Sequence, residues 1–505
     1  MMNISNLIAY HASRTPERTA VVYQDTRISY ADLDDRVLHL AAYLAARGIG
    51  ENDVVAVMMK NAPAFIEICA ATSHLGGVFL PINYRLAADE VTYITGNAEA
   101  RLLFADDDFA EIVAGMEETI LLDAQARCDI RTLCRRADGA PDLEAVRRPA
   151  YRQPEDLFRL MYTSGTTDRP KGVMHTYSNF YWKCVDHTID LDLTADDRIL
   201  VVGPLYHVGA FDLPGVAVLW RGGMMCILRE FDEEEALTAI EHERLTCAWL
   251  APVMLGRLIG YEGRERFDTR SLRWAIGGGE KTPEARIRAF KELFPNGRYI
   301  DGYGLTETCS GDTLMEAGRE IEKIGSTGRA LAHCEVSIRD PQGREMPAGA
   351  EGEICVRGPK VTAGYWRDPE KTKNSFFAGN WFRSGDMGRL DDDGFLFVTD
   401  RIKDMILSGG ENIASSEVER VIYSLPQVAE AAVIGIADEQ WSERPVAVLV
   451  MKPGEALTYE ELKTHCEKHL ARFKVPKALY LRDGLPRNPS GKVLKRALRD
   501  EFTAD

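Results

Sequence analysis

Residues 162–173, YTSGTTDRPKGV, carry the side chains and the backbone that suit binding of a chain of phosphate groups. Gly165 and Gly172 lack a β-carbon, so the backbone at these positions can approach phosphate oxygens closely. The donors to the phosphates would be the hydroxyl and ammonium groups of Thr163, Ser164, Thr166, Thr167 and Lys171. The segment is not a Walker loop, because no glycine-lysine-hydroxyl triplet ends it. A solvated turn is the alternative, and the length of the pattern favours a polyphosphate site.

The elements around this loop are expected to alternate between strands and helices. Residues 157–161, before the loop, are apolar and β-prone, and residues 177–189, after it, have a helical pattern. Further strands are expected at residues 20–23, 53–58, 78–81, 199–202, 246–250 and 273–276, and helices at residues 33–44 and 64–73. This alternation predicts a layered α/β domain.

The last third of the chain has a different pattern. Short strands separated by turns follow residue 330 and indicate a β-rich subdomain, in which the three aspartates at residues 391–393 are expected to form a turn rather than a metal cluster. A boundary near residues 400–404 is followed by about one hundred residues, a normal size for a domain. The elements expected after it are strands at residues 428–435 and 446–451 and a helix at residues 459–470. We therefore predict an N-terminal domain over residues 1–400 and a C-terminal domain over residues 401–505.

The composition excludes several classes of protein. The 505 residues are 45% hydrophobic, enough for a large core, and a formal net charge of −17 argues against a general nucleic-acid binder. No apolar run approaches the roughly 20 residues that span a bilayer. The N-terminus lacks the pattern of a secretory signal, so we expect a cytoplasmic protein. The ten cysteines are scattered without a CxxC pair, which predicts reduced thiols and no structural zinc.

Six short motifs follow one another along the chain. They are YTSGTTDRPKG at residues 162–172, GGE at 278–280, DGYGLTET at 301–308, WFRSGD at 381–386, DRIKDMILSGGENI at 400–413 and PRNPSGK at 486–492. With these motifs in this order, essentially the whole chain resembles the adenylate-forming superfamily, which contains acyl-CoA synthetases, nonribosomal adenylation domains and firefly luciferases. Within it, the pattern is most similar to bacterial fatty acyl and feruloyl-type CoA synthetases. The resemblance implies a large N-terminal domain and a small, mobile α+β C-terminal domain that together enclose the active site.

The resemblance also implies which residues bind ATP and magnesium. Tyr303 would stack on the adenine ring, Thr306 would bind the α-phosphate, and Glu307, a hard oxygen ligand, would hold the Mg²⁺ that neutralises the nucleotide. Around the base, the implied contacts are Gly278, Gly279, Glu280, Asp301, Gly302 and Gly304. At the ribose hydroxyls, the implied contacts are Asp386 and Arg401.

Two chemical steps are implied, and Lys492 would serve the first. A carboxylate attacks the α-phosphorus of ATP and pyrophosphate leaves, and positive charge from Lys492 would stabilise that transition state. The thiol of coenzyme A then attacks the mixed anhydride, which gives acyl-CoA and AMP. Lys403 matches the hinge about which the C-terminal domain rotates between the steps. Rotation would withdraw Lys492 and bring Ser408, Gly409 and Gly410 to the pantetheine channel.

The organic acid is less well defined by the residues. His207, in PLYHVGAF, matches the residue that orients the carboxylate in the family. Positions that line the acyl pocket in relatives are Gly209, Ala210, Phe211, Trp249, Gly277, Cys309, Ser310 and Gly311. Most are small, which implies room for a sizeable acid, and none is arginine or lysine, so a second carboxylate on the substrate is not expected. We favour an aryl, hydroxycinnamate-like acid or a medium-chain fatty acid, because no long apolar insertion would enclose a very long tail.

The sequence departs from the family pattern at a few positions, and two other functions stay open. Asp168 stands where glycine is usual in the phosphate loop, and Glu280 and Lys281 replace a small residue and a proline. We expect slight disturbance at Asp168, which tolerates unusual turns, and an altered pocket floor at Glu280. The alternatives to a CoA ligase are an enzyme that loads a carrier protein and a non-catalytic nucleotide sensor. The expected partners are a small carboxylic acid and coenzyme A, and the residues leave the oligomeric state open, with a homodimer as one alternative.

Overall fold

The computed structural model describes residues 3–116, 118–136, 142–163, 170–278, 282, 284–401, 404–408, 411–438, 441–470, 472–487 and 493–503. The chain divides into two compact units, Met1–Val336 with Val356–Phe382, and Ser337–Cys355 with Arg383–Asp505. The domain boundary that we predict at residues 400/401 refers to a C-terminal domain that moves as a unit. This boundary stays a prediction. In the described part of the chain, every helix is too short or too polar to cross a membrane.

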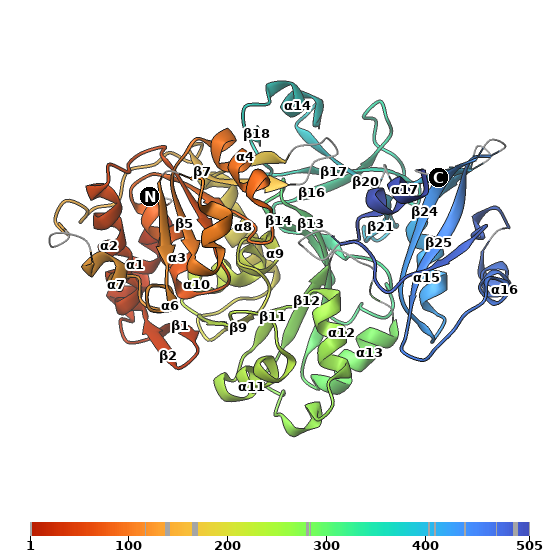
Figure 1. Cartoon of the computed structure of the whole chain (residues 1–505), viewed down its shortest axis with the longest axis horizontal. Coiled ribbons are helices and arrows are strands. Elements are labelled where there is room, and N and C mark those ends of the chain that lie inside the picture. Colours follow the sequence, from red (N-terminus) through yellow and green to blue (C-terminus); the bar gives the residue numbers. More distant parts are fainter. Residues whose placement is uncertain are drawn as a thin grey trace. The chain divides into compact units, whose positions relative to one another are not determined.

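A mixed sheet in the first unit carries the predicted phosphate loop (Figure 1). Its strands are β3 (Val54–Met58), β4 (Val78–Pro81), β5 (Ala100–Asp106), β6 (Thr119–Leu122), β7 (Leu157–Thr163), β8 (Lys171–Thr176) and β18 (Gly364–Tyr365). They lie in the order β18-β8-β7-β4-β3-β5-β6. Strands β3 to β6 are parallel, because helices such as α3 (Pro63–His74) and α4 (Ala88–Ala98) return the chain to the same edge of the sheet. By contrast, β7 and β8 are antiparallel neighbours.

A second sheet of the first unit carries the segment with Thr306 and Glu307. Its strands are β1 (Thr19–Tyr23), β2 (Thr26–Ser29), β9 (Arg198–Val201), β10 (Met224–Ile227), β11 (Cys247–Trp249), β12 (Trp274–Gly278), β13 (Arg298–Leu305), β14 (Ser310–Leu314) and β15 (Arg329–Ala330), in the order β15-β14-β13-β12-β11-β9-β10-β1-β2. Apolar side chains of α11 (Glu233–Glu243), α12 (Pro252–Gly260) and α13 (Glu284–Leu293) form a core with this sheet. The layered α/β architecture expected from the alternating pattern is confirmed.

Helix α2 (Tyr30–Ala46) shows why these residues form a helix. The Ser29 side chain caps it by accepting from the backbone N–H of Asp32, and Gly48 at φ +74° follows its end. A helix is predicted at residues 33–44, and the apolar residues that recur there at 4,3,4 spacing are fully buried: Leu33, Val37, Leu40 and Leu44. It packs against α1 (Ile4–Arg14) and α3.

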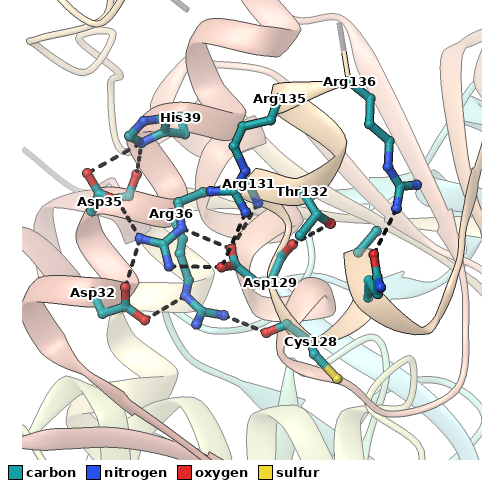
Figure 2. Close-up of polar contacts among 12 residues, drawn as sticks. Asp32, Asp35, Arg36, His39, Cys128, Asp129, Arg131, Thr132, Arg135 and Arg136 are labelled. Carbon is teal, nitrogen blue, oxygen red and sulfur yellow. Dashed lines mark hydrogen bonds and ion pairs between the residues drawn. The ribbon is translucent and has the colours of Figure 1, made fainter.

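An ion-pair cluster joins α2 to the short helices α6 (Ala124–Cys128) and α7 (Arg131–Arg135) (Figure 2). Arg36 donates to Asp32 at 2.7 Å and to the backbone carbonyl of Cys128 at 2.6 Å. Arg131 donates to Asp35 at 2.8 Å and to Asp129 at 2.9 Å. The cluster therefore ties α6 and α7 to α2. The remaining helices of the first unit are α5 (Ala110–Val113), α8 (Tyr177–Asp190), α9 (Val208–Ala210), α10 (Val216–Trp220) and α14 (Pro369–Asn374).

Short strands follow residue 330, as the turn-rich pattern predicts. They are β16 (Glu335–Arg339), β17 (Gly352–Arg357), β19 (Phe376–Phe377), β20 (Trp381–Leu390) and β21 (Leu396–Arg401), in the order β16-β17-β20-β19 with β21 beside β20. Between β20 and β21, the Asp391 carboxylate accepts from the backbone N–H groups of Asp393 and Phe395. The three aspartates at residues 391–393 therefore form the turn that we expected.

The second unit also contains a small sheet covered by helices on both faces. Its strands are β22 (Ile406–Ser408), β23 (Glu411–Ile413), β24 (Val428–Asp438), β25 (Ser442–Met451) and β26 (Leu479–Leu481), and its helices are α15 (Ser415–Tyr423), α16 (Tyr459–His469) and α17 (Lys495–Thr503). Alternate residues of β24 point to opposite faces. Ala431 and Val433 pack in a core with α15 and α16, and Ala432 and Ile434 pack in a core with α17. These strands and helices are the blue segments of Figure 1.

Candidate active site

The predicted phosphate loop lies between two paired strands. The last residue of β7, Thr163, is the cross-strand partner of Lys171, the first residue of β8. The sequence pattern predicts only the strand before the loop, and the structure adds the strand after it. Thr163 and Lys171, which are both predicted to bind phosphate, therefore lie at the same end of the β7–β8 strand pair, on either side of residues 164–169. Ser164, Gly165, Thr166 and Thr167, together with Asp168, lie outside the described residues, so their roles stay predictions.

Thr306 and Glu307 occupy the turn that joins β13 to β14. Two non-glycine residues at the end of this turn have positive φ, Cys309 at +57° and Ser310 at +97°. Such conformations are costly for residues with a β-carbon and persist where the surroundings hold them. The turn is held by the backbone N–H of Cys309, which donates to the Thr306 carbonyl at 3.1 Å.

His175, on β8, connects this turn to the loop hairpin. Its Nδ1 lies 2.9 Å from Nη2 of Arg159, and because a guanidinium only donates, Nδ1 is the acceptor. The ring proton is therefore on Nε2, which donates to the carbonyl oxygen of Thr306 at 2.7 Å. Burial, and then the charge of Arg159, lower the pKa of His175 to about 3, so the ring stays neutral. One neutral imidazole thus joins the two predicted phosphate-binding segments.

Arg159 belongs to a buried ionic group that the sequence analysis did not identify. Asp212 receives Lys183 Nζ at 2.8 Å and lies 2.9 Å from Nη2 of Arg159, and all three side chains are at most 1% exposed. Burial opposes ionisation of Asp212, but the two cations lower its pKa to about 2. The available signal was an arginine within the otherwise apolar run 157–161, which at that position requires a buried counter-ion.

Glu307 has the chemistry of a magnesium ligand. The hydroxyl of Tyr365, on β18, donates to its Oε1 at 2.9 Å, and the backbone N–H of Thr362 donates to its carbonyl at 2.7 Å. These contacts hold a half-buried carboxylate in one orientation beside Thr306. Mg²⁺ is bound through one or two carboxylates together with phosphate oxygens and water, so the donor at Glu307 fits the expected metal.

The residues expected around the adenine lie on two adjacent parallel strands. Gly278, at the end of β12, pairs with Gly302 on β13, and Gly277 pairs with Asp301. A β-carbon on Gly278 would lie 2.7 Å from the carbonyl oxygen of Gly302, so only glycine fits. Burial raises the pKa of Asp301 to about 7. Tyr303 is half-buried and Gly304 is exposed on the same strand, whereas Gly279, Glu280 and Lys281 lie outside the described residues.

Aromatic side chains occupy the space next to two glycines of the predicted acyl pocket, Gly209 and Gly277. A β-carbon on Gly209 would lie 2.5 Å from Cζ2 of the Trp249 indole, and one on Gly203 would lie 2.7 Å from its Cζ3. Likewise, a β-carbon on Gly277 would lie 1.7 Å from the hydroxyl of Tyr299. The expectation that small residues at these positions leave room for the acid needs correction, because Trp249 and Tyr299 fill that side of the backbone.

His207 lies beside Trp249, and the ring centroids of the two residues are 6.4 Å apart. Its Nδ1 accepts from the backbone N–H of Gly209 at 3.1 Å, so Nε2 carries the proton. Burial lowers the pKa of His207, and the ring is neutral at physiological pH. His207 can therefore donate through Nε2 to an acceptor such as a carboxylate oxygen.

The other predicted pocket residues are brought together around the same segment. The Ser310 hydroxyl donates to the carbonyl of Val208 at 3.4 Å, which joins β14 to α9. Cys309 is buried with Sγ 3.8 Å from Arg159 Nη2. Phe211 is buried and packs edge-on against Phe65, with ring centroids 5.6 Å apart, so it contributes to the core.

The remaining predicted site residues belong to the second unit. Asp386, on β20, is buried and is the cross-strand partner of Arg401 on β21. Ser408 ends β22 and pairs with Glu411 on β23, so the strands around residues 409–410 are antiparallel neighbours. Lys403, Gly409, Gly410 and Lys492 lie outside the described residues, and their roles stay predictions.

Two family models match this chain. Residues 8–366 match the family model described as AMP-binding enzyme, and residues 417–492 match the AMP-binding enzyme C-terminal domain. The chain belongs to the AMP-binding enzyme family. A feruloyl-CoA synthase from Amycolatopsis sp. is 37% identical over 97% of both chains. The long-chain-fatty-acid–CoA ligase FadD13 of Mycobacterium tuberculosis is 34% identical over 100% of this chain and 99% of its own.

A solved structure extends the likeness of this AMP-binding enzyme to the fold. The o-succinylbenzoate coenzyme A synthetase MenE of Bacillus subtilis, in complex with ATP and a magnesium ion, superposes with a TM-score of 0.87 at 31% identity, over 98% of this chain and 99% of that one. The predicted membership in the adenylate-forming superfamily is confirmed. So are the predicted class, an AMP-forming acid–CoA ligase, and its cofactors, ATP, Mg²⁺ and coenzyme A.

Proposed function

We propose that this ligase activates an aryl acid of the hydroxycinnamate type and transfers it to coenzyme A. The observation that carries the proposal is the indole of Trp249, which lies against Gly203 and Gly209 beside His207. An indole beside His207 favours a planar aromatic acid, because stacked or edge-on ring contacts contribute about 0.5–1.5 kcal/mol beyond burial. The 37% identity to a feruloyl-CoA synthase points the same way.

A medium-chain fatty acid is the second candidate, and the observation in its favour is the 34% identity to a fatty-acid–CoA ligase. A dicarboxylic acid is disfavoured by the charges behind the pocket. Lys183 and Arg159 both face Asp212, and Lys360 is paired with Asp312 at 2.5 Å. Each cation therefore already has a carboxylate partner within the protein.

In the first step, His207 donates from Nε2 to one oxygen of the acid and leaves the other oxygen to attack the α-phosphorus. The bond from that phosphorus to the bridging oxygen breaks, and pyrophosphate leaves with both bonding electrons. Lys171, the loop hydroxyl groups and Lys492 stabilise the charge that grows on the phosphates. Magnesium held at Glu307 would neutralise part of that charge. In the second step, the thiol of coenzyme A loses its proton and attacks the acyl carbon, and AMP leaves.

We further propose that residues 401–505 act as a lid that turns about Lys403 and exchanges Lys492 for Ser408, Gly409 and Gly410 at the site. This proposal is supported by the match of residues 417–492 to the C-terminal domain of the family. Lys492→Ala is expected to slow adenylate formation at least about hundredfold while leaving thioester formation from supplied acyl adenylate within about threefold. Equal loss in both half-reactions would contradict this role. A cytoplasmic homodimer remains our expectation, and light scattering on the purified protein measures the oligomeric state.

The choice of acid is tested by pyrophosphate release with a panel that contains ferulate, p-coumarate, octanoate, palmitate and o-succinylbenzoate. We expect the highest kcat/KM with the aryl monocarboxylates, followed by octanoate. A kcat/KM for palmitate or o-succinylbenzoate that is tenfold above both aryl acids would refute the aryl assignment.

A further inference from the structure

His187, on α8, carries a buried nitrogen that finds no hydrogen-bond partner in the part of the chain that the structure describes. Its Nδ1 lies 3.0 Å from the backbone carbonyl oxygen of Asp212, and since a carbonyl only accepts, the ring proton is on Nδ1. Nε2 therefore presents a lone pair. The side chain is fully buried, and Nε2 has no hydrogen-bond partner among the described residues. Leaving a buried acceptor unpaired costs about 1–3 kcal/mol, so such groups are rare and call for an explanation.

The surroundings keep this nitrogen an acceptor. Burial, and then the charges of Lys183 and Lys360, lower the pKa of His187 well below its ordinary value. Asp212 acts in the opposite direction, but its charge is shared with Arg159 and Lys183. The ring therefore stays neutral throughout the physiological pH range, and Nε2 can take a hydrogen bond only from a group that donates.

Gly311 leaves the position of an absent β-carbon close to Nε2. A β-carbon placed on Gly311 would lie 3.6 Å from Nε2 of His187 and 3.3 Å from Cδ1 of Leu213. We call this unoccupied β-carbon position the gap; an apolar side chain and one acceptor lie against it. The carbonyl of Gly311 is fixed by the ammonium group of Lys360, so the backbone is held in place.

The gap lies next to the predicted acyl pocket. Gly311 and Ser310 lie on β14, directly after Cys309, and Ser310 is hydrogen-bonded to the backbone of Val208, the neighbour of His207. A long acid whose carboxylate is held at His207 would extend along this segment. The buried acceptor at His187 is therefore placed to meet the end of the acid remote from its carboxylate.

We propose that His187 and Gly311 form a hydroxyl-binding subsite, in which a hydroxyl group at the distal end of the acid donates to Nε2 of His187. The subsite rests on the proposed function, and it names the substrate more closely: a phenolic acid is preferred over the same acid without its hydroxyl group or with that group methylated. A phenol with a pKa near 10 is protonated at physiological pH and can donate. A methoxy group has no hydrogen to donate to Nε2.

The experiment compares p-coumarate, cinnamate and p-methoxycinnamate in the pyrophosphate-release assay, with 8-hydroxyoctanoate and octanoate as an aliphatic pair. For the wild-type protein we expect kcat/KM for p-coumarate to exceed that for cinnamate by about tenfold to hundredfold, because cinnamate leaves the buried acceptor unpaired. If the hydroxylated acid is preferred only within the aryl pair, p-coumarate over cinnamate, the group at the subsite is a phenol. Preference confined to the aliphatic pair overturns the phenolic assignment.

Two variants test the subsite from opposite sides. His187→Phe keeps a ring but removes the acceptor, and Gly311→Ala keeps the acceptor but fills the gap. In both we expect the ratio of kcat/KM for p-coumarate to kcat/KM for cinnamate to fall to within about twofold of unity. Thermal unfolding of each variant establishes that it is folded, and Gly311→Ala leaves the bond from His187 to Asp212 in place.

The outcomes separate this inference from the function on which it rests. If the wild-type protein turns over p-coumarate and cinnamate equally, the gap holds only a buried water and the inference is wrong, although the ligase assignment stands. A preference that survives both variants overturns it as well, because the hydroxyl group must then be bound elsewhere. If no acid in the panel releases pyrophosphate, the proposed function fails, and this inference fails with it.

Discussion

His175 donates its Nε2 hydrogen to the backbone carbonyl oxygen of Thr306 across 2.7 Å. The first residue lies on the strand that follows the phosphate loop, and the second lies in the turn that carries Glu307. Because Arg159 occupies Nδ1, the tautomer that this bond requires is the one that its neighbours impose. The two segments are therefore positioned relative to each other by a neutral ring backed by a buried ion pair.

We predict that this bond positions Thr306 for the first chemical step. His175→Leu should lower the rate of ATP–pyrophosphate exchange by about tenfold to hundredfold, with thioester formation from supplied acyl adenylate affected less than about threefold. In His175→Gln the amide can still donate to Thr306, so we expect recovery to within about fivefold of wild type. The rate of exchange should show no titration of this residue above pH 5, because its pKa is about 3.

The matched control is His74, another buried histidine in the same unit, which contacts Ser5 Oγ at 3.0 Å and the Val146 carbonyl at 2.7 Å. His74→Leu should cost stability without a selective loss of exchange. If His175→Leu and His74→Leu each slowed adenylate formation and thioester formation to the same extent, a positioning role of His175 would be ruled out.

A substitution at Gly209 tests whether Trp249 takes part in acid binding. Substitution of Gly209 by alanine would place a β-carbon 2.5 Å from Cζ2 of Trp249, so the indole must move. We expect Gly209→Ala to lower kcat/KM for ferulate by tenfold or more and to reduce stability by about 1–3 kcal/mol. Gly256→Ala is the control, because nothing lies within 4 Å of its β-carbon position on α12, and it should leave ferulate turnover within about twofold of wild type. Equal turnover in the two variants would argue against a role for Trp249 in acid binding.

We expect the buried carboxyl group of Glu67 to make the free energy of unfolding of the first unit depend on pH. Glu67 is fully buried on α3, with Oε1 3.2 Å from Nη1 of Arg36. Burial raises the pKa of Glu67 from 4.5 to about 7, and Arg36 offsets only part of that rise. The folded protein therefore holds this proton more tightly than the unfolded chain does. The stabilisation is complete below pH 4.5 and is lost as the pH rises through 7, by about 3 kcal/mol in all.

Glu67→Gln removes the titrating group while keeping a similar shape. We expect the wild-type melting temperature to fall relative to that of Glu67→Gln between pH 5 and pH 8, in thermal unfolding followed by calorimetry. The prediction fails if the two melting temperatures change in parallel over that range. Asp32, which still pairs with Arg36 at 2.7 Å, keeps the arginine neutralised in the variant.

Elements with a strong periodic pattern could be predicted from the sequence. The helix predicted from the spacing of Leu33, Val37, Leu40 and Leu44 is α2, and the strand predicted at residues 78–81 is β4. Strand β8 escaped prediction, because its residues follow a glycine-rich loop and its strand character depends on pairing with β7. Pairing between strands is a property of the whole fold, and a local pattern does not contain it.

The candidate site could be predicted where a motif specifies it, and less well where partners come from distant parts of the chain. Thr306 and Glu307 were identified because they lie within one motif. His175, Lys183 and His187 were not identified, since each is recognised by partners more than twenty residues away, such as Asp212. Gly209 and Gly277 were interpreted as space for a ligand, whereas their missing side chains make room for Trp249 and Tyr299.

The most direct test of the central claim is the product balance in a single reaction. Purified protein is incubated with ATP, Mg²⁺, coenzyme A and p-coumarate, and thioester, AMP and pyrophosphate are quantified together. We predict equal amounts of all three, none of them formed without the acid, and p-coumaroyl adenylate accumulating when coenzyme A is left out. Formation of ADP and phosphate, or the absence of pyrophosphate with every acid offered, would contradict the account.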